Sequence, residues 1–171
     1  RDITGITIGK NVTNIGENAF ANCLNLTAVT MSESVVSIGA KAFQSCSSLA
    51  EIQLPSGLAK IESYTFSYCR SLTDITIPDS VEEIGSYAFS DCSGLESITI
   101  PDSVTSMGEY AFSGCSAAAE LNIGGGLKSL DTFSFAYCTN LKNVFIPSNI
   151  ESIGQAAFLG CSTLEEVEIS D

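Results

Sequence analysis

The chain has 171 residues, with seven Lys and Arg against 20 Asp and Glu, and its net charge is −13. This excess of acid argues against binding to nucleic acid or to an anionic membrane surface, since both need clustered basic side chains. The chain contains no His, which excludes Ser-His-Asp catalysis and His-ligated metal sites. Hydrophobic residues make up 44%, which is too many for a disordered chain, and no apolar run is long enough to cross a membrane.

The cysteines divide the chain into equal units. Consecutive cysteines are 23 residues apart throughout, and no insertion or deletion interrupts the series. A fixed period of this length is typical of a solenoid, in which every unit is one turn of a coil. The sequence therefore predicts a single array over residues 1–171, with about 7.4 repeats. The cysteines are Cys23, Cys46, Cys69, Cys92, Cys115, Cys138 and Cys161.

The first predicted element of each unit is a short strand. In residues 72–78 the apolar side chains of Ile75 and Ile77 alternate with polar ones, the pattern of a strand with one buried face. Pro78 has no N–H to donate, so we expect it to end the strand. Matching residues recur every 23 positions, so strands of successive units should pair side by side into a parallel sheet.

The rest of the unit is predicted to return the chain to its starting side. Asp79 and Ser80 form a turn, and residues 81–84 form a second, shorter extended piece. Gly85 is expected to adopt a backbone conformation that a Cβ atom would resist. Residues 87–92 carry Ala, Phe and Cys three to four positions apart, which predicts one helical or 3₁₀ turn.

The full repeat pattern is C-x-x-L-x-x-I-x-I-P-x-x-V-x-x-I-G-x-x-A-F-x-x-C, and residues 69–115 contain its clearest copies. This pattern resembles the BspA-type (treponemal-type) leucine-rich repeat over essentially the whole chain. The resemblance implies a leucine-rich repeat solenoid with its parallel sheet on the concave side. It also implies a bacterial or protozoan protein that is secreted or lies on the cell surface, often as an adhesin.

The fifth unit departs most from the pattern. Residues 117–119 are all Ala and remove the usual Leu, and residues 124–126 are all Gly and remove the usual Pro. Residues 133–135 read Phe-Ser-Phe in place of the usual x-Ala-Phe. We expect the strand ladder to be looser there, with a local kink.

The cysteine column predicts free, buried thiols. Seven is an odd number, so the cysteines cannot all pair within the chain. Side chains stacked in register point in parallel, which keeps their Cβ atoms too far apart for easy bridging and cannot surround a zinc ion. We therefore expect each Cys, and each Phe three positions before it, to fill the interior of the coil. No cofactor or metal is predicted.

The candidate binding residues are the outward side chains of the longer strand, five and seven positions after each Cys. Solenoids bind partners on such surfaces. Acidic side chains dominate the first column, although only Glu51 and Asp74 are immediate neighbours, so the repulsion is tolerable without any ligand. A plain solvated surface therefore remains the alternative. The candidates are Glu51, Gln53, Asp74, Thr76, Ser97, Thr99, Glu120, Asn122, Asn143, Phe145, Glu166 and Glu168.

Phe145 is the exception in its column, which otherwise holds Thr, Gln, Asn and Glu. The alternation of the strand directs it outward while Val144 and Ile146 face the interior. An exposed aromatic ring beside acids and amides is a plausible anchor for a partner. The alternative is a contact at the edge of the fold with a capping segment.

Two functions remain open from the sequence. The first is a non-enzymatic protein-binding or adhesion module whose acidic face engages a protein partner, such as a basic host or matrix protein. The second is a structural spacer or stalk that carries another domain. The sequence shows no pairing of a nucleophile with a general base, which argues against an enzyme. Neither end shows a polar cap, so we expect an excerpt of a longer protein and a tendency to associate end to end.

Overall fold

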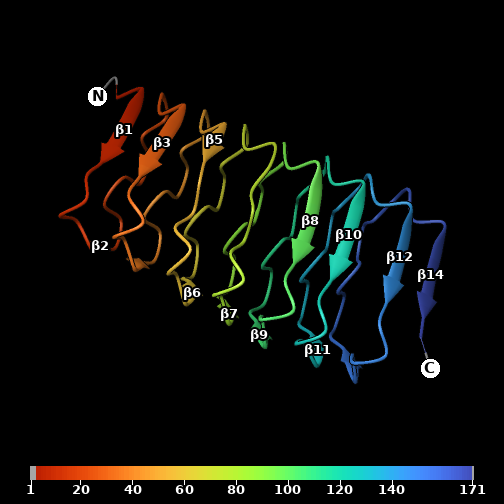
Figure 1. The fold of residues 1–171 in the computed structure, drawn as a ribbon. Helices are drawn as coiled ribbons and strands as arrows, with labels where there is room; N and C mark the ends of the chain where they lie inside the picture. Colours follow the sequence, from red (N-terminus) through yellow and green to blue (C-terminus); the bar gives the residue numbers. More distant parts are fainter. Residues whose placement is uncertain (1–2, 171) are drawn as a thin grey trace.

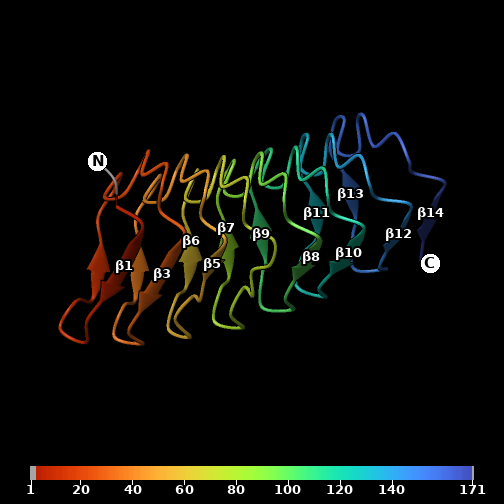
Figure 2. The same cartoon turned by 90° about the horizontal axis from the view of Figure 1, so that it is seen from above.

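The computed structural model describes residues 3–170, which form one stack of similar coils (Figures 1 and 2). Most coils carry a strand on one side, a strand of two residues on another side and turns between them, and no helix occurs among the described residues. The strands of the first side are β1 (Gly5–Ile8), β3 (Ala28–Met31), β5 (Glu51–Ile52), β8 (Ser97–Ile100), β10 (Glu120–Ile123), β12 (Asn143–Ile146) and β14 (Glu166–Ile169). Those of the second side are β2 (Asn14–Ile15), β4 (Ser37–Ile38), β6 (Lys60–Ile61), β7 (Glu83–Ile84), β9 (Ser106–Met107), β11 (Ser129–Leu130) and β13 (Ser152–Ile153).

Strand pairing follows the 23-residue period. On the first side Ile6 of β1 lies opposite Val29 of β3, and on the second side Ile61 of β6 lies opposite Ile84 of β7. Every pair is parallel. The predicted fold, a leucine-rich repeat solenoid with parallel sheets, is confirmed, and each residue type meets its own kind in the coils above and below.

The sheet on the first side is interrupted twice. Hydrogen bonds join β1 to β3 and β3 to β5, then β8 to β10, and then β12 to β14. One interruption falls at residues 74–77, which form no strand although they belong to the most regular repeat. The other falls between β10 and β12. The expectation of a looser fifth unit therefore holds on one side only, because all four residues of β10 pair with β8.

The turn of each coil is not helical, which corrects the predicted helical or 3₁₀ turn. The N–H groups of Ala88 and Ser90 bond within the coil, to the carbonyl groups of Gly85 and Tyr87. The N–H groups of Tyr87, Phe89 and Asp91 bond to carbonyl groups of the next coil. A positive φ recurs five residues and one residue before every Cys, at 14 positions of which only two are Gly. This left-handed backbone turns alternate N–H groups along the stack, which a helix would not do. The fourteen residues are Asn18, Asn22, Lys41, Ser45, Tyr64, Tyr68, Tyr87, Asp91, Tyr110, Gly114, Phe133, Tyr137, Ala156 and Gly160.

The reason for Gly85 also differs from the expectation. Its φ lies outside the positive range, so the residue is not required by its own dihedral angles. A Cβ atom there would lie 2.6 Å from the backbone nitrogen of Ser63 and 2.8 Å from the carbonyl carbon of Glu62 in the preceding coil. Close approach of two coils explains the Gly.

The core is a set of side-chain columns that run the length of the stack. Phe rings from Phe20 to Phe158 stack on one another with centroids 4.9 to 5.9 Å apart. All seven cysteines are free, and the five central ones are buried. Each buried thiol donates to the carbonyl of a Phe in the preceding coil, as from Cys92 Sγ to Phe66 O at 3.1 Å. Burial raises the pKa of Cys92 to about 12.

Candidate functional site

The longer strands lie on the side toward the viewer in Figure 1. We use the name concave face for the surface that their outward side chains form. Alternation holds there as predicted, because the side chain of Phe145 is 51% exposed while its neighbours Val144 and Ile146 are buried. Eleven of the twelve candidate residues are exposed, and Ser97 is half-buried. The first side of the stack thus carries all twelve, and they line separate hollows.

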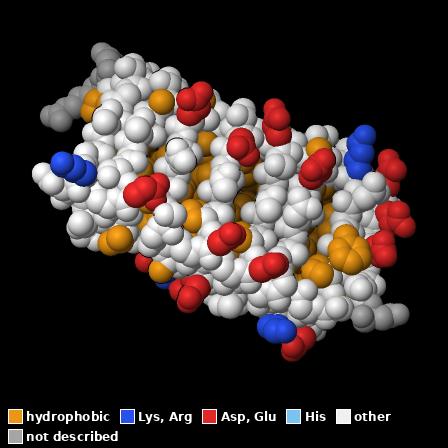
Figure 3. Space-filling model, in the orientation of Figure 1, with side chains coloured by type: hydrophobic (Ala, Val, Ile, Leu, Met, Phe, Trp, Pro, Cys, Tyr) orange, Lys and Arg blue, Asp and Glu red, His pale blue; other side chains and the backbone are white. Residues whose placement is uncertain are grey.

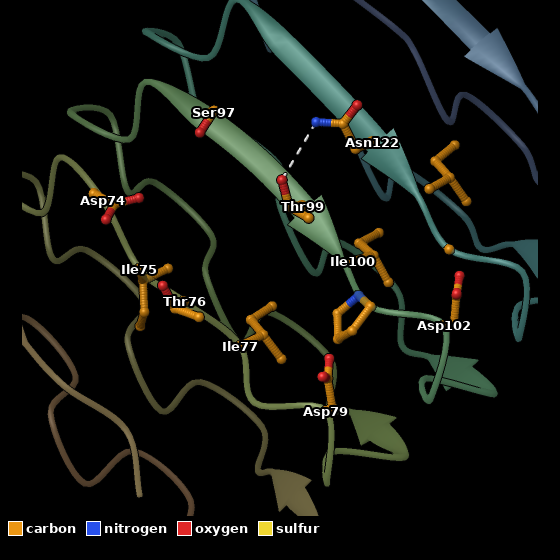
Figure 4. A pocket seen from close by; sticks show the side chains of 13 residues that line it. Asp74, Ile75, Thr76, Ile77, Asp79, Ser97, Thr99, Ile100, Asp102 and Asn122 are labelled. Carbon is orange, nitrogen blue, oxygen red and sulfur yellow. Dashed lines mark hydrogen bonds between the residues drawn. The ribbon is translucent and has the colours of Figure 1, made fainter. Parts of the chain in front are cut away.

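One hollow, which we call the central hollow, spans three adjacent coils and has a volume of about 570 Å³ (Figure 4). Five of the candidates line it, and the half-buried side chains of Ile75 and Ile123 supply part of its apolar surface. Ile75 is half-buried because residues 74–77 leave the strand ladder. The lining consists of Asp74, Ile75, Thr76, Ile77, Asp79, Ser97, Thr99, Ile100, Pro101, Asp102, Asn122, Ile123 and Gly124.

Two carboxylates of the central hollow were missed by the sequence analysis. Asp79 and Asp102 each follow a Pro, Asp79 after residues 74–77 and Asp102 after β8, and the sequence predicts only a turn at Asp79. Figure 4 shows Asp102 beyond the end of β8 and Asp79 at the matching place of the preceding coil, below Thr99 and Asn122. Their position directly after the Pro, two residues beyond a buried Ile, was the signal that could have placed them on this rim.

The turn carboxylates also tie neighbouring coils together. Asp102 Oδ1 accepts a hydrogen bond from the N–H of Gly125 in the next coil, at 2.7 Å. Glu33 does the same for the backbone and the hydroxyl of Ser56, and the backbone bond is the main cause of its lowered pKa. Within the hollow, Asn122 Nδ2 donates to Thr99 Oγ1 at 3.4 Å. The polar lining can therefore bind through hydroxyl, amide and carboxylate groups.

A second hollow, the C-terminal hollow, collects most of the remaining candidates. Phe145 and Glu168 lie opposite each other on β12 and β14, and Asn143 lies opposite Glu166. With Glu120, an aromatic ring and three carboxylates thus share one small surface. The lining consists of Ala119, Glu120, Leu121, Asn122, Asn143, Val144, Phe145, Glu166 and Glu168.

Glu51 and Gln53 line a shallow hollow with Asp74, at the first interruption of the sheet. Glu51 and Asp74 are the neighbouring acids of their column, and no strand pairing joins β5 to residues 74–77. Like charges placed side by side destabilise a sheet, which favours the interruption at this point.

The acids of the concave face have no basic partners. Within residues 3–170 the ion pairs are those of Lys60 with Glu62 and Glu83, and none involves a candidate residue. Figure 3 shows hydrophobic side chains in the middle of this face with Asp and Glu side chains around them. No group of three or more Cys, Asp and Glu side chains in the described part is arranged to hold a metal, and no helix there could span a membrane.

Comparison with known proteins agrees with the repeat. The family model of the BspA type leucine rich repeat region matches in six copies, over residues 1–115 and 59–171. The chain belongs to the BspA-type leucine-rich repeat family. Among curated proteins, no sequence matches the chain.

Solved leucine-rich repeat proteins share the solenoid. A protein from Bacteroides ovatus is 31% identical with a TM-score of 0.92, over 96% of this chain and 45% of that protein. The T. pallidum leucine-rich repeat protein is also 31% identical with a TM-score of 0.87, over 96% of this chain and 79% of that one. The pneumococcal vaccine antigen PcpA, at 18% identity and a TM-score of 0.61, shares the fold over 99% of this chain and 51% of its own. The chain thus spans less than half the length of the Bacteroides protein.

Proposed function

We propose that the chain is a non-enzymatic protein-binding or adhesion module of a secreted or cell-surface protein, and that its concave face binds a basic protein partner. The observation that carries the proposal is a row of hollows whose carboxylates have no basic partner within residues 3–170. Such a surface attracts cationic side chains and repels acidic ones. Placement at the cell surface follows from what membership of the BspA-type family implies.

The two main hollows have different roles in this proposal. The central hollow combines Asp74, Asp79 and Asp102 with half-buried Ile75, so it suits a Lys or Arg side chain whose aliphatic stem packs on the Ile. The C-terminal hollow offers the ring of Phe145, which is exposed and covered by no other described segment. Aromatic rings of this kind often dominate the binding energy of an interface.

The charge of the central hollow is tested with synthetic peptides of equal length that are basic, neutral or acidic, by fluorescence anisotropy. We expect only the basic peptides to bind, and to bind more weakly as salt rises. The variant Asp74→Asn, Asp79→Asn, Asp102→Asn should lose most of this binding. The matched control, Glu17→Gln, Glu82→Gln, Glu151→Gln, removes the same number of charges elsewhere and should keep it. Equal loss in both variants, or binding of acidic peptides, would contradict the proposal.

The role of Phe145 is tested with Phe145→Ala and the same basic peptides, extended by one apolar residue. Loss of an exposed anchor should weaken binding by about 1 to 2 kcal/mol and hardly change the melting temperature. A large loss of stability with unchanged binding would instead assign Phe145 to a contact at the edge of the fold.

A spacer or stalk is the second candidate function. It is favoured by the unbroken columns of buried Phe and Cys, which make the stack a continuous body. A spacer needs no ligand, so the unmodified chain should then bind basic peptides no better than the variant Asp74→Asn, Asp79→Asn, Asp102→Asn does.

End-to-end self-association belongs to the same proposal. Apolar side chains of the last coils are exposed, among them Ile153, Leu159, Val167 and Ile169. A second copy that continues the stack would cover them. Sedimentation velocity over a range of concentrations should show a rising weight-average mass, and a constant mass of one chain would contradict this part.

A further inference from the structure

A ladder of aromatic rings lies outside the concave face, on the turn side of four consecutive coils. Tyr64, Tyr87, Tyr110 and Phe133 stand five positions before a Cys, and each ring is half-buried. Neighbouring ring centroids are 4.7, 4.6 and 4.7 Å apart, with interplanar angles of 3°, 6° and 6°. The phenol rings of three tyrosines therefore lie face to face near the surface.

The backbone holds these rings in register. All four residues have a φ between 55° and 60°, which is unfavourable for large side chains and is usually occupied by Gly or Asn. The N–H of Tyr64 bonds to Ser86 O and that of Tyr87 to Glu109 O, so each ring carrier is tied to the next coil. The position of each ring is thus set before any partner or reagent arrives.

The two ends of the run of three tyrosine rings are covered by different side chains. The ammonium group of Lys41 lies 5.8 Å from the ring centre of Tyr64, and Phe133 stacks on the far side of Tyr110. Phe has no hydroxyl group and cannot form a phenoxyl radical. The reactive part of the ladder is therefore limited to two adjacent pairs that share Tyr87.

We propose that Tyr64, Tyr87 and Tyr110 form an oxidative modification site, which yields an intramolecular dityrosine when a haem peroxidase and hydrogen peroxide act on the protein. Each of two neighbouring phenols loses one electron and one proton to the oxidant, and a carbon–carbon bond forms between the ring carbons next to the hydroxyl-bearing carbons. The hydrogen on each of these carbons leaves as a proton while a proton returns to each oxygen. Overall, two phenols and one hydrogen peroxide give one dityrosine and two waters.

Proximity is the reason to expect coupling within the molecule. Two radicals held a few ångströms apart combine far faster than radicals on separate proteins. Tyr68 and Tyr137 are exposed by 41% and 52%, and neither stacks on another aromatic ring within residues 3–170. Their radicals lack a stacked tyrosine within the described residues, so we expect them to couple mainly between molecules. The inference does not depend on the proposed function of the concave face.

The experiment treats the intact chain at low concentration with horseradish peroxidase and hydrogen peroxide. Monomer separated by gel filtration should show the blue fluorescence of dityrosine. Trypsin cuts after Lys60, Arg70 and Lys128, which places Tyr64 on residues 61–70 and both Tyr87 and Tyr110 on residues 71–128. A 64–87 bond joins the two peptides, and an 87–110 bond leaves the second peptide lighter by two hydrogen atoms.

The deciding variant is Tyr87→Phe, which keeps the stacked ring and removes the shared phenol. Monomer dityrosine should fall to background, because Tyr64 and Tyr110 are then two coils apart. The control Tyr68→Phe, Tyr137→Phe should keep the monomer signal and lose intermolecular dimers. Unchanged monomer dityrosine in Tyr87→Phe, or dityrosine found only in dimers of the unmodified chain, would overturn the proposal.

Discussion

At the scale of single residues, the cysteines show how a buried position in the stack changes the acidity of a side chain. The central thiols lie among Phe and Leu side chains and donate to backbone carbonyls, so their surroundings favour the neutral form. Burial raises the pKa of every one of these thiols, to about 11 for Cys46 and to about 12 for Cys92 and Cys138. At neutral pH these cysteines are therefore uncharged and pack in the core like small apolar side chains.

Raising the pH above about 9 should destabilise the fold. An unfolded thiol has a pKa of about 8.5, whereas that of folded Cys92 is about 12. Between these values the unfolded state has lost a proton that the folded state keeps, so the free energy of unfolding falls by about 1.4 kcal/mol per pH unit and thiol. Well below pH 8.5 both states are protonated and the thiols add no pH dependence.

Urea unfolding between pH 7 and pH 11 measures this effect. Cys92→Ala should be less stable at neutral pH because it leaves a small cavity, and its stability should also fall less steeply above pH 9. The same steep fall in the variant and in the unmodified chain would show that groups other than this thiol cause the alkaline loss.

A matched pair of variants tests two constraints on the backbone, namely the positive φ in the turns and the close contact between coils at the Gly column. Ala156 has a φ of 54°, so Ala156→Gly should raise the free energy of unfolding by about 1 kcal/mol. Gly85→Ala adds the same methyl group where it meets the backbone of Ser63, and should lower it by about 1 to 3 kcal/mol. Both are measured by urea unfolding. Destabilisation by both variants would mean that the left-handed backbone at Ala156 is not strained.

At the scale of elements, the strands differ although the repeats are alike. β8 and β10 pair over four residues, while residues 74–77 of the regular repeat form no strand. The interruption coincides with the neighbouring acids Glu51 and Asp74 and with the half-buried Ile75. A break in the ladder thus opens the floor of the central hollow.

Native-state hydrogen exchange should report this difference. The N–H groups of residues 74–77 have no backbone partner among the described residues, so they should exchange faster than the N–H groups of β10 that bond within the sheet. Mass spectrometry of peptic fragments, or NMR, resolves the two segments. Equal protection of both would show that the sheet is continuous in solution.

At the scale of the whole molecule, charge acts on stability as well as on binding. The chain carries a net charge of −13, and Lys60 makes the ion pairs found within residues 3–170. Repulsion among the acids is strongest at low ionic strength, where the screening length is about 30 Å at 0.01 M salt against about 8 Å at 0.15 M.

Added NaCl should therefore raise the melting temperature of the chain between these two concentrations. Screening weakens repulsion in the compact state more than in the expanded unfolded state. Differential scanning calorimetry measures the shift, and the triple variant Glu17→Gln, Glu82→Gln, Glu151→Gln should show a smaller one. A melting temperature that falls with salt would contradict this account.

The sequence by itself determined the period, the parallel register and the core columns of Leu, Ile, Val, Phe and Cys. A spacing of 23 residues without insertions places each residue type beside its own kind, so one repeat specifies the contacts of all. The outward direction of Phe145 followed from the same alternation. The sequence located the Gly column, but the reason expected for it was wrong. Close contact between coils requires Gly there, and the dihedral angles of the Gly do not.

Only the tertiary structure decided where the sheet opens, which carboxylates reach the hollows and how the turns run. The left-handed residues before each Cys include Tyr, Lys and Phe, which carry no sequence signal for a positive φ. Asp79 and Asp102 reach the central hollow, and Tyr87 meets Tyr110, through the way that one coil lies on the next. Such features depend on backbone angles and on small shifts between coils, which a pattern of residue types does not specify.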